Sequence, residues 1–110
     1  MVFYTNHFLK PQFKGMTFGP LIFIRPEWKG DAGLLEHEQM HVKQFWRTFG
    51  VHALLYTFSP GYRLKAEAEA YKCQYRIHPD RLLLYAEFIA TRYNLHITTT
   101  AAAQAILDAP

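Results

Sequence analysis

Five consecutive residues, His37-Glu38-Gln39-Met40-His41, combine two histidines and a glutamate at a spacing that suits metal chemistry. In a helix, residues four apart lie on one face, so both imidazoles can reach a single ion. The Glu38 carboxylate then lies beside that ion without ligating it, where it can take a proton from water. The pattern predicts a zinc site that includes His37 and His41, with Glu38 as a catalytic base.

The residues around this motif predict the helix that it needs. Asp31 suits an N-cap, the helical pattern runs from about Ala32 to Phe49, and Gly50 provides a stop. On a helical wheel, Glu38 falls inside an apolar arc that we expect to face the core. The members of this arc are Leu34, Leu35, Val42, Phe45, Trp46 and Phe49. A carboxylate in such an arc is costly unless it is paired or used, which favours function over chance.

A catalytic zinc site usually has three protein ligands, so the motif leaves one to be found. The candidates are Glu67, Glu69, His52, His78, His96 and Asp80. On the wheel of the next strong helix, Glu67 lies on an apolar, aromatic face, whereas Glu69 lies among lysines and arginines, with Lys65 one turn before it. Because a carboxylate on an apolar face calls for a cation, we prefer Glu67 over Glu69 as the third ligand.

The periodicity of the whole chain predicts an α+β fold, mostly helical, with a small sheet near the N-terminus and a single domain spanning residues 1–110. Residues 2–14 read as irregular. Strands are expected at Met16–Phe18 and Leu21–Arg25. After the motif helix, helices are expected over residues 51–58 (short and buried), 62–77 and 81–93, with a turn at 78–80 and a final short helix through Leu107, capped within residues 98–100.

Composition narrows the function classes. Lys and Arg give a net charge of only +3 and are spread along the 110 residues, so no nucleic-acid partner is expected. The single cysteine, Cys73, forms no disulfide within the chain and suits a reducing compartment. No apolar run reaches the length of a membrane span, and the N-terminus lacks the order of a signal peptide. We therefore expect a cytoplasmic protein without a membrane partner.

The histidine motif and the later run Arg63-x-x-x-Glu67-x-x-Ala70 together resemble the gluzincin metallopeptidases, over residues 20–77. The length is similar to that of the minigluzincins, the minimal members of this clan. The run from His41 to Gln44 is also similar to the HExxH-V-x-Q pattern of several bacterial and phage-encoded zincin-like domains.

This resemblance implies a zinc ion held by His37, His41 and Glu67, with Glu38 as general base and acid. The sequence departs from the pattern at Tyr71, where many gluzincins have Asp or Asn that orients a zinc-ligating histidine. The tyrosine hydroxyl could accept the imidazole N–H in its place.

The first hypothesis for function is a zinc-dependent peptidase acting on peptides or unstructured proteins. Zincins bind substrate along an edge strand, for which Leu21–Arg25 is the candidate; an interior strand is the alternative. A second group that stabilises the oxyanion is expected, and the candidates are Tyr71, Tyr75, Tyr62 and His52.

Two other hypotheses stay open. The domain could be a weakly active or inactive zincin-like binding or assembly module, associated with a phage or a toxin, in which zinc is a structural staple. It could also be a latent enzyme whose C-terminal segment, Thr98–Pro110, lies over the cleft. The oligomeric state does not follow from the sequence.

Overall fold

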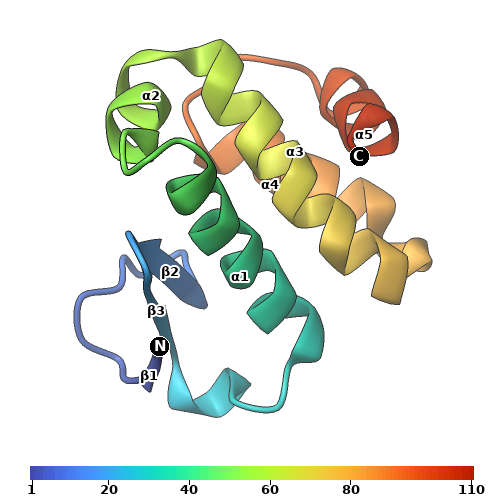
Figure 1. The fold of residues 1–110 in the computed structure, drawn as a ribbon. Helices are drawn as coiled ribbons and strands as arrows, with labels where there is room; N and C mark the ends of the chain where they lie inside the picture. The colour runs from blue at the N-terminus through green and yellow to red at the C-terminus, as the bar shows by residue number, and fades with distance from the viewer.

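The histidine motif lies on α1 (Ala32–Arg47), which is packed between a small sheet and a layer of helices (Figure 1). The computed structural model describes residues 1–110. It contains strands β1 (Val2–Tyr4), β2 (Gly15–Phe18) and β3 (Leu21–Ile24), and helices α2 (His52–Phe58), α3 (Pro60–Ile77), α4 (Leu82–Arg92) and α5 (Thr99–Asp108). The predicted α+β class is confirmed. None of the helices is both long enough and apolar enough to cross a bilayer.

The three strands form a sheet of order β1-β3-β2, with β1 parallel and β2 antiparallel to β3. The central position of β3 means that the edge-strand prediction for Leu21–Arg25 is wrong and the interior alternative is correct. The cause is β1, which forms within the segment expected to be irregular and occupies one side of β3. The strand that borders α1 with one side unpaired is β2.

Helix α1 begins where the sequence predicts, because the Asp31 side chain accepts a hydrogen bond from the Leu34 amide at 3.0 Å. It ends at Arg47, two residues before the expected Phe49, because Phe49 and Gly50 both have positive φ angles. The predicted core stripe is wrong at this end: Trp46 is 61% exposed and Phe49 97%.

The buried face of α1 instead carries mostly polar residues. Its buried residues are Gly33, Leu34, His37, Glu38, His41 and Gln44. His37, His41 and Glu38 belong to a candidate metal site, which therefore lies in the interior of the molecule, where the helical wheel placed apolar residues. The wheel was nevertheless correct that Glu38 is buried.

Helix α2 forms as predicted but is not buried. No residue of α2 is fully buried, and Phe58 is 78% exposed. The two half-buried polar side chains of α2, His52 and Tyr56, lie one turn apart and reach the cavity beside α1. Helix α2 therefore turns its polar side chains towards the site and leaves most of its large apolar side chains in solvent.

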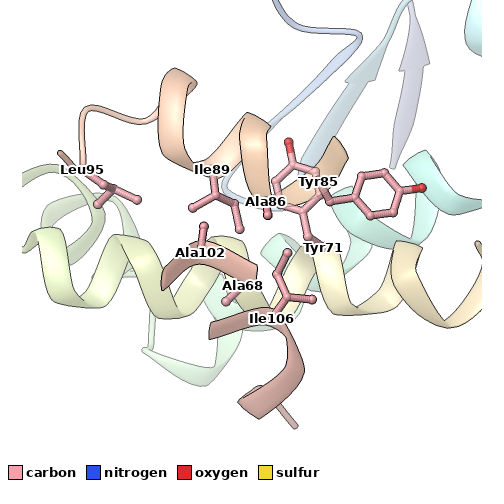
Figure 2. Close-up of a cluster of buried hydrophobic side chains, with 8 residues drawn as sticks. All are labelled: Ala68, Tyr71, Tyr85, Ala86, Ile89, Leu95, Ala102 and Ile106. Atoms are coloured by element: carbon pink, nitrogen blue, oxygen red, sulfur yellow. The ribbon is translucent and has the colours of Figure 1, made fainter. Parts of the chain in front are cut away.

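The main apolar core joins α3, α4 and α5 rather than α1 (Figure 2). Its buried members are Ala68, Tyr71, Tyr85, Ala86, Ile89, Leu95, Ala102 and Ile106. The Thr98 hydroxyl accepts a hydrogen bond from the Ala101 amide and caps α5, as the sequence predicts. Because α5 packs on α3 and α4 and lines neither cavity beside the motif, the prediction that Thr98–Pro110 lies over the cleft is wrong.

Candidate metal centre

His37, His41 and Glu67 bring three ligand atoms into one small triangle. The two Nε2 atoms lie 3.2 Å apart, and Glu67 Oε1 lies 3.4 Å from His37 Nε2 and 3.3 Å from His41 Nε2. Ligands 2.0–2.1 Å from a tetrahedral zinc ion lie about 3.3–3.4 Å apart, so the triangle matches three corners of such a tetrahedron. Glu67 Oε1 is buried and has no hydrogen-bond donor. This group could hold a metal ion.

Burial and charge act together on this triangle. The Glu67 residue is 2% exposed and both histidines are buried. Burial alone would lower the pKa of His41, but the Glu67 carboxylate outweighs it and raises that pKa to about 9. Burial alone would raise the pKa of Glu67, but His41 and His37 hold it well below its usual range. The buried Glu67 carboxylate is therefore stabilised by positive charge beside it, which a protonated imidazole or a metal ion would supply.

Gln44 orients His41 through Nδ1, the ring nitrogen that faces away from the triangle. Its amide nitrogen donates to Ala66 O at 3.0 Å and to Glu69 Oε1 at 2.8 Å, so its Oε1 faces His41 Nδ1, at 2.9 Å. An Nδ1–H donated to this oxygen leaves the Nε2 lone pair free for a metal. This role of Gln44 is not among the sequence-based predictions, although its position three residues after His41 places it on the same helical face.

Glu69 lies outside the triangle, as predicted, but for a different reason. The sequence suggested that Lys65 pairs with it on the same helix. In the structure, Glu69 forms a salt bridge with Arg47 of α1 at 3.1 Å and accepts the bond from Gln44. Its charge is thus satisfied by α1, and the ion-binding group contains no further His, Cys, Asp or Glu.

Tyr71 supports His37 through its ring rather than its hydroxyl. The two rings meet edge to face with centroids 4.3 Å apart, and the Tyr71 hydroxyl is bonded to the Tyr93 hydroxyl at 2.8 Å. His37 Nδ1 is buried without a hydrogen-bond partner. The expected bond from the imidazole N–H to the Tyr71 hydroxyl is therefore absent.

Glu38 lies beside the triangle and is oriented by the sheet. Its Oε2 is 3.9 Å from His37 Nε2, and its Oε1 accepts a hydrogen bond from the Thr17 hydroxyl of β2 at 2.9 Å. A Cβ atom at Gly15 would lie 3.2 Å from Phe23 O and 3.5 Å from Glu38 Cγ, so glycine keeps this side of the carboxylate uncrowded. One carboxylate oxygen is fixed and the other faces the ligands.

Two side chains of α2 complete the surroundings. The Tyr56 hydroxyl donates to Glu67 Oε2 at 2.5 Å, and His52 Nδ1 lies 2.6 Å from the Tyr62 hydroxyl. Burial, and then the Glu67 carboxylate, raises the pKa of Tyr56 far above its ordinary value, so it remains a donor. Tyr56 is not among the residues predicted for the site, although its spacing of four residues from His52 places both side chains on one face of α2.

The candidate metal centre opens onto one cavity of about 520 Å³. Its lining includes the three ligands, Glu38, His52 and Tyr56, together with residues 15–19 from β2 and its turn. Tyr71 and Tyr75 do not line it, and neither do His78, Asp80 or His96. The ligand group therefore has access to solvent and to a molecule of peptide size.

No family model matches the chain, and no similar curated protein or solved structure was found.

Proposed function

We propose that the protein is a zinc-dependent, zincin-like peptidase acting on peptides or unstructured proteins. The observation that carries this proposal is the buried triangle of His37, His41 and Glu67 with the Glu38 carboxylate beside it, at the wall of an open cavity. Two imidazoles and one carboxylate form the donor set of a catalytic zinc site, which keeps a fourth position for water or substrate.

A zinc ion in this position supplies Lewis acidity, which lowers the pKa of water and polarises a carbonyl group. Glu38 would take the proton of the attacking water at Oε2, because Oε1 is held by Thr17. The same carboxyl group would then deliver that proton to the leaving amine nitrogen. Gln44 and the ring of Tyr71 act as positioning groups for His41 and His37 respectively.

The unpaired side of β2 is suited to hold an extended substrate. Arg25 N donates to Lys14 O at 2.9 Å, which fixes Met16 and Phe23 as the next hydrogen-bonded pair of the register. The backbone N–H and C=O groups of Gly15 and Thr17 then face away from β3. Both residues line the cavity, so a peptide strand added at this edge would lie beside Glu38.

Among the four predicted stabilisers of the oxyanion, His52 is the best placed. It lines the cavity, its ring centroid is 6.1 Å from that of His41, and its contact with Tyr62 engages only Nδ1. Tyr71 has its hydroxyl engaged by Tyr93, and Tyr75 lies outside the cavity.

The test compares wild type with Glu38→Gln, after loading with zinc, on an unstructured protein substrate. We expect one zinc per chain in both proteins and a loss of cleavage rate of about 10²–10⁴-fold in the variant. Glu36→Gln, an exposed glutamate of the same helix, is the matched control and should cleave like wild type. His37→Ala should lose the metal. A zinc-loaded wild type that cleaves no peptide would overturn the proposal.

The second candidate, a zinc-stapled binding or assembly module without catalysis, is favoured by one feature. The ligands come from two different helices, α1 and α3, and all are buried, so an ion would cross-link the interior of a small domain. The response of the fold to metal removal separates the two candidates.

A further inference from the structure

We propose that the cavity beside the metal centre selects peptides that carry acidic side chains close to the bond to be cleaved. The cleavage part of this inference rests on the proposed peptidase function, whereas the binding part does not.

Three cations line the same cavity as the metal ligands: Lys10, Arg63 and Arg92. None of them forms a salt bridge. The only carboxylates in the lining are Glu38 and Glu67, and both belong to the metal centre. With a divalent cation bound there, the two carboxylates are balanced and the three cations remain as uncompensated positive charge facing the substrate.

Arg63 is held rigidly in the wall of the cavity. It lies one turn before Glu67 on α3, and its guanidinium donates to Tyr56 O at 2.9 Å and to Asn94 O at 3.3 Å. Its Nε is buried and has no acceptor. These bonds to carbonyl groups fix the guanidinium without neutralising it, so its charge remains available to an anion.

Arg92 is the last residue of α4 and lines the same cavity. Its guanidinium packs on the Phe88 ring at 3.8 Å and donates one hydrogen bond, to Gln12 O at 3.1 Å. The next residue, Tyr93, contacts Tyr71, whose ring lies against His37. The guanidinium retains free N–H groups for a carboxylate, and Arg–carboxylate pairs are among the stronger polar contacts.

Lys10 is exposed, on the loop between β1 and β2. An extended peptide along the outer edge of β2 would thus lie in a cavity whose wall carries Arg63, Arg92 and Lys10, from three separate segments. Because successive side chains of a strand alternate in direction, an acidic residue near the scissile bond can face this wall while the backbone pairs with β2. The three cationic side chains of this wall are therefore suited to bind a carboxylate of the peptide.

The binding test uses zinc-loaded Glu38→Gln protein, which holds substrate without cleaving it. Two fluorescein-labelled peptides of one sequence carry either glutamate or glutamine at the same three interior positions. By fluorescence anisotropy, the glutamate peptide should bind about tenfold more tightly or better, and the difference should shrink as salt is raised. Adding Arg92→Gln or Lys10→Gln should reduce the difference severalfold, whereas Lys65→Gln, exposed and outside the cavity, should leave it unchanged.

A cleavage assay with wild type separates this inference from the proposed function. If both peptides are cleaved equally well and bound equally well, selection for acidic residues is overturned and the peptidase stands. If neither is cleaved but the glutamate peptide binds more tightly, the peptidase fails and the binding preference stands. Absence of measurable binding by the glutamate peptide also overturns the inference.

Discussion

At the candidate metal centre, the Nδ1 atom of His41 has a hydrogen-bonding partner and the Nδ1 atom of His37 has none. Gln44 Oε1 meets His41 Nδ1 at 2.9 Å, whereas His37 Nδ1 is buried without a partner and has only the Tyr71 ring beside it. Partners of this kind fix the tautomer and the orientation of a ligating imidazole. The affinity for metal should therefore depend more on Gln44 than on the hydroxyl of Tyr71.

Gln44→Ala should weaken zinc binding by about 10–100-fold, because His41 loses the acceptor that orients it. The measurement is competition with a chelator of known affinity. Gln39→Ala, an exposed glutamine on the same helix, should bind zinc like wild type. An unchanged affinity in Gln44→Ala would remove Gln44 from the centre.

Tyr71→Phe should leave zinc affinity within about twofold of wild type, because the hydroxyl contacts Tyr93 and not the imidazole. The ring, which packs on His37, is retained in this variant. Tyr71→Ala should weaken binding by loss of that packing. A large loss of zinc in Tyr71→Phe would instead favour the hydrogen bond expected from the sequence.

Residue types and helical spacing were sufficient to choose Glu38, His37, His41 and Glu67 from the sequence. Each of these residues carries an ionisable or metal-binding group on a helix face that is expected to be buried. Which face of a helix is buried can be predicted from the periodicity of that helix alone. The roles of Gln44 and Tyr56 depend on which helices meet: Gln44 contacts Ala66 of α3, and Tyr56 of α2 contacts Glu67. Sequence periodicity contains no such information about the pairing of elements.

At the scale of elements, α1 connects the sheet to the helical layer. Its Glu38 is hydrogen-bonded to Thr17 of β2, and its two histidines meet Glu67 of α3. The metal would thus join α1 to α3, while the core of α3, α4 and α5 contains no residue of α1.

Removal of zinc by a chelator should therefore lower the melting temperature and leave most of the helical circular dichroism signal at room temperature. The large apolar cluster contains none of the metal ligands, so it should stay packed without zinc. The loss of stability arises because the buried charged groups of the empty triangle are costly without a cation between them. Re-addition of zinc should restore both activity and melting temperature. Complete unfolding on chelation would support the zinc-stapled module instead.

Edge strand β2 gives a second prediction at this scale. Substrate peptides N-methylated at the amides that would pair with Gly15 and Thr17 should show a rise in KM of up to about tenfold, because each backbone hydrogen bond contributes about 0.5–1.5 kcal/mol. Steady-state kinetics on a set methylated one position at a time would reveal an alternation with period two. Equal effects at every position would argue against binding as an added strand.

The sequence identified β2 and β3 but not their order, because β1 is short and has exposed residues at two of its three positions. Its pairing with β3 is parallel and joins distant parts of the N-terminal segment. The local sequence pattern does not show that β1 pairs with β3. For this reason β3, which was predicted as an edge strand, lies at the centre of the sheet.

At the scale of the whole molecule, the main apolar core contains none of the three candidate metal ligands, although its Tyr71 ring touches His37. The largest buried cluster is built on α3, α4 and α5, with Ala102 and Ile106 fully buried (Figure 2). Ile106→Ala should destabilise the domain by about 2–5 kcal/mol through the cavity it creates. Leu107→Ala, at the neighbouring exposed position, should change stability by less than about 0.5 kcal/mol. Denaturant titration measures both variants.

The position of α5 also bears on the order of events at the ribosome. A nascent chain that has reached Glu67 already contains every ligand, but α4 and α5, which bury the far side of α3, have yet to be synthesised. Until Ala102 and Ile106 are in place, α3 lacks part of its buried apolar packing, on the side away from α1. We therefore expect the candidate site to bind a metal ion more tightly once α5 has been synthesised.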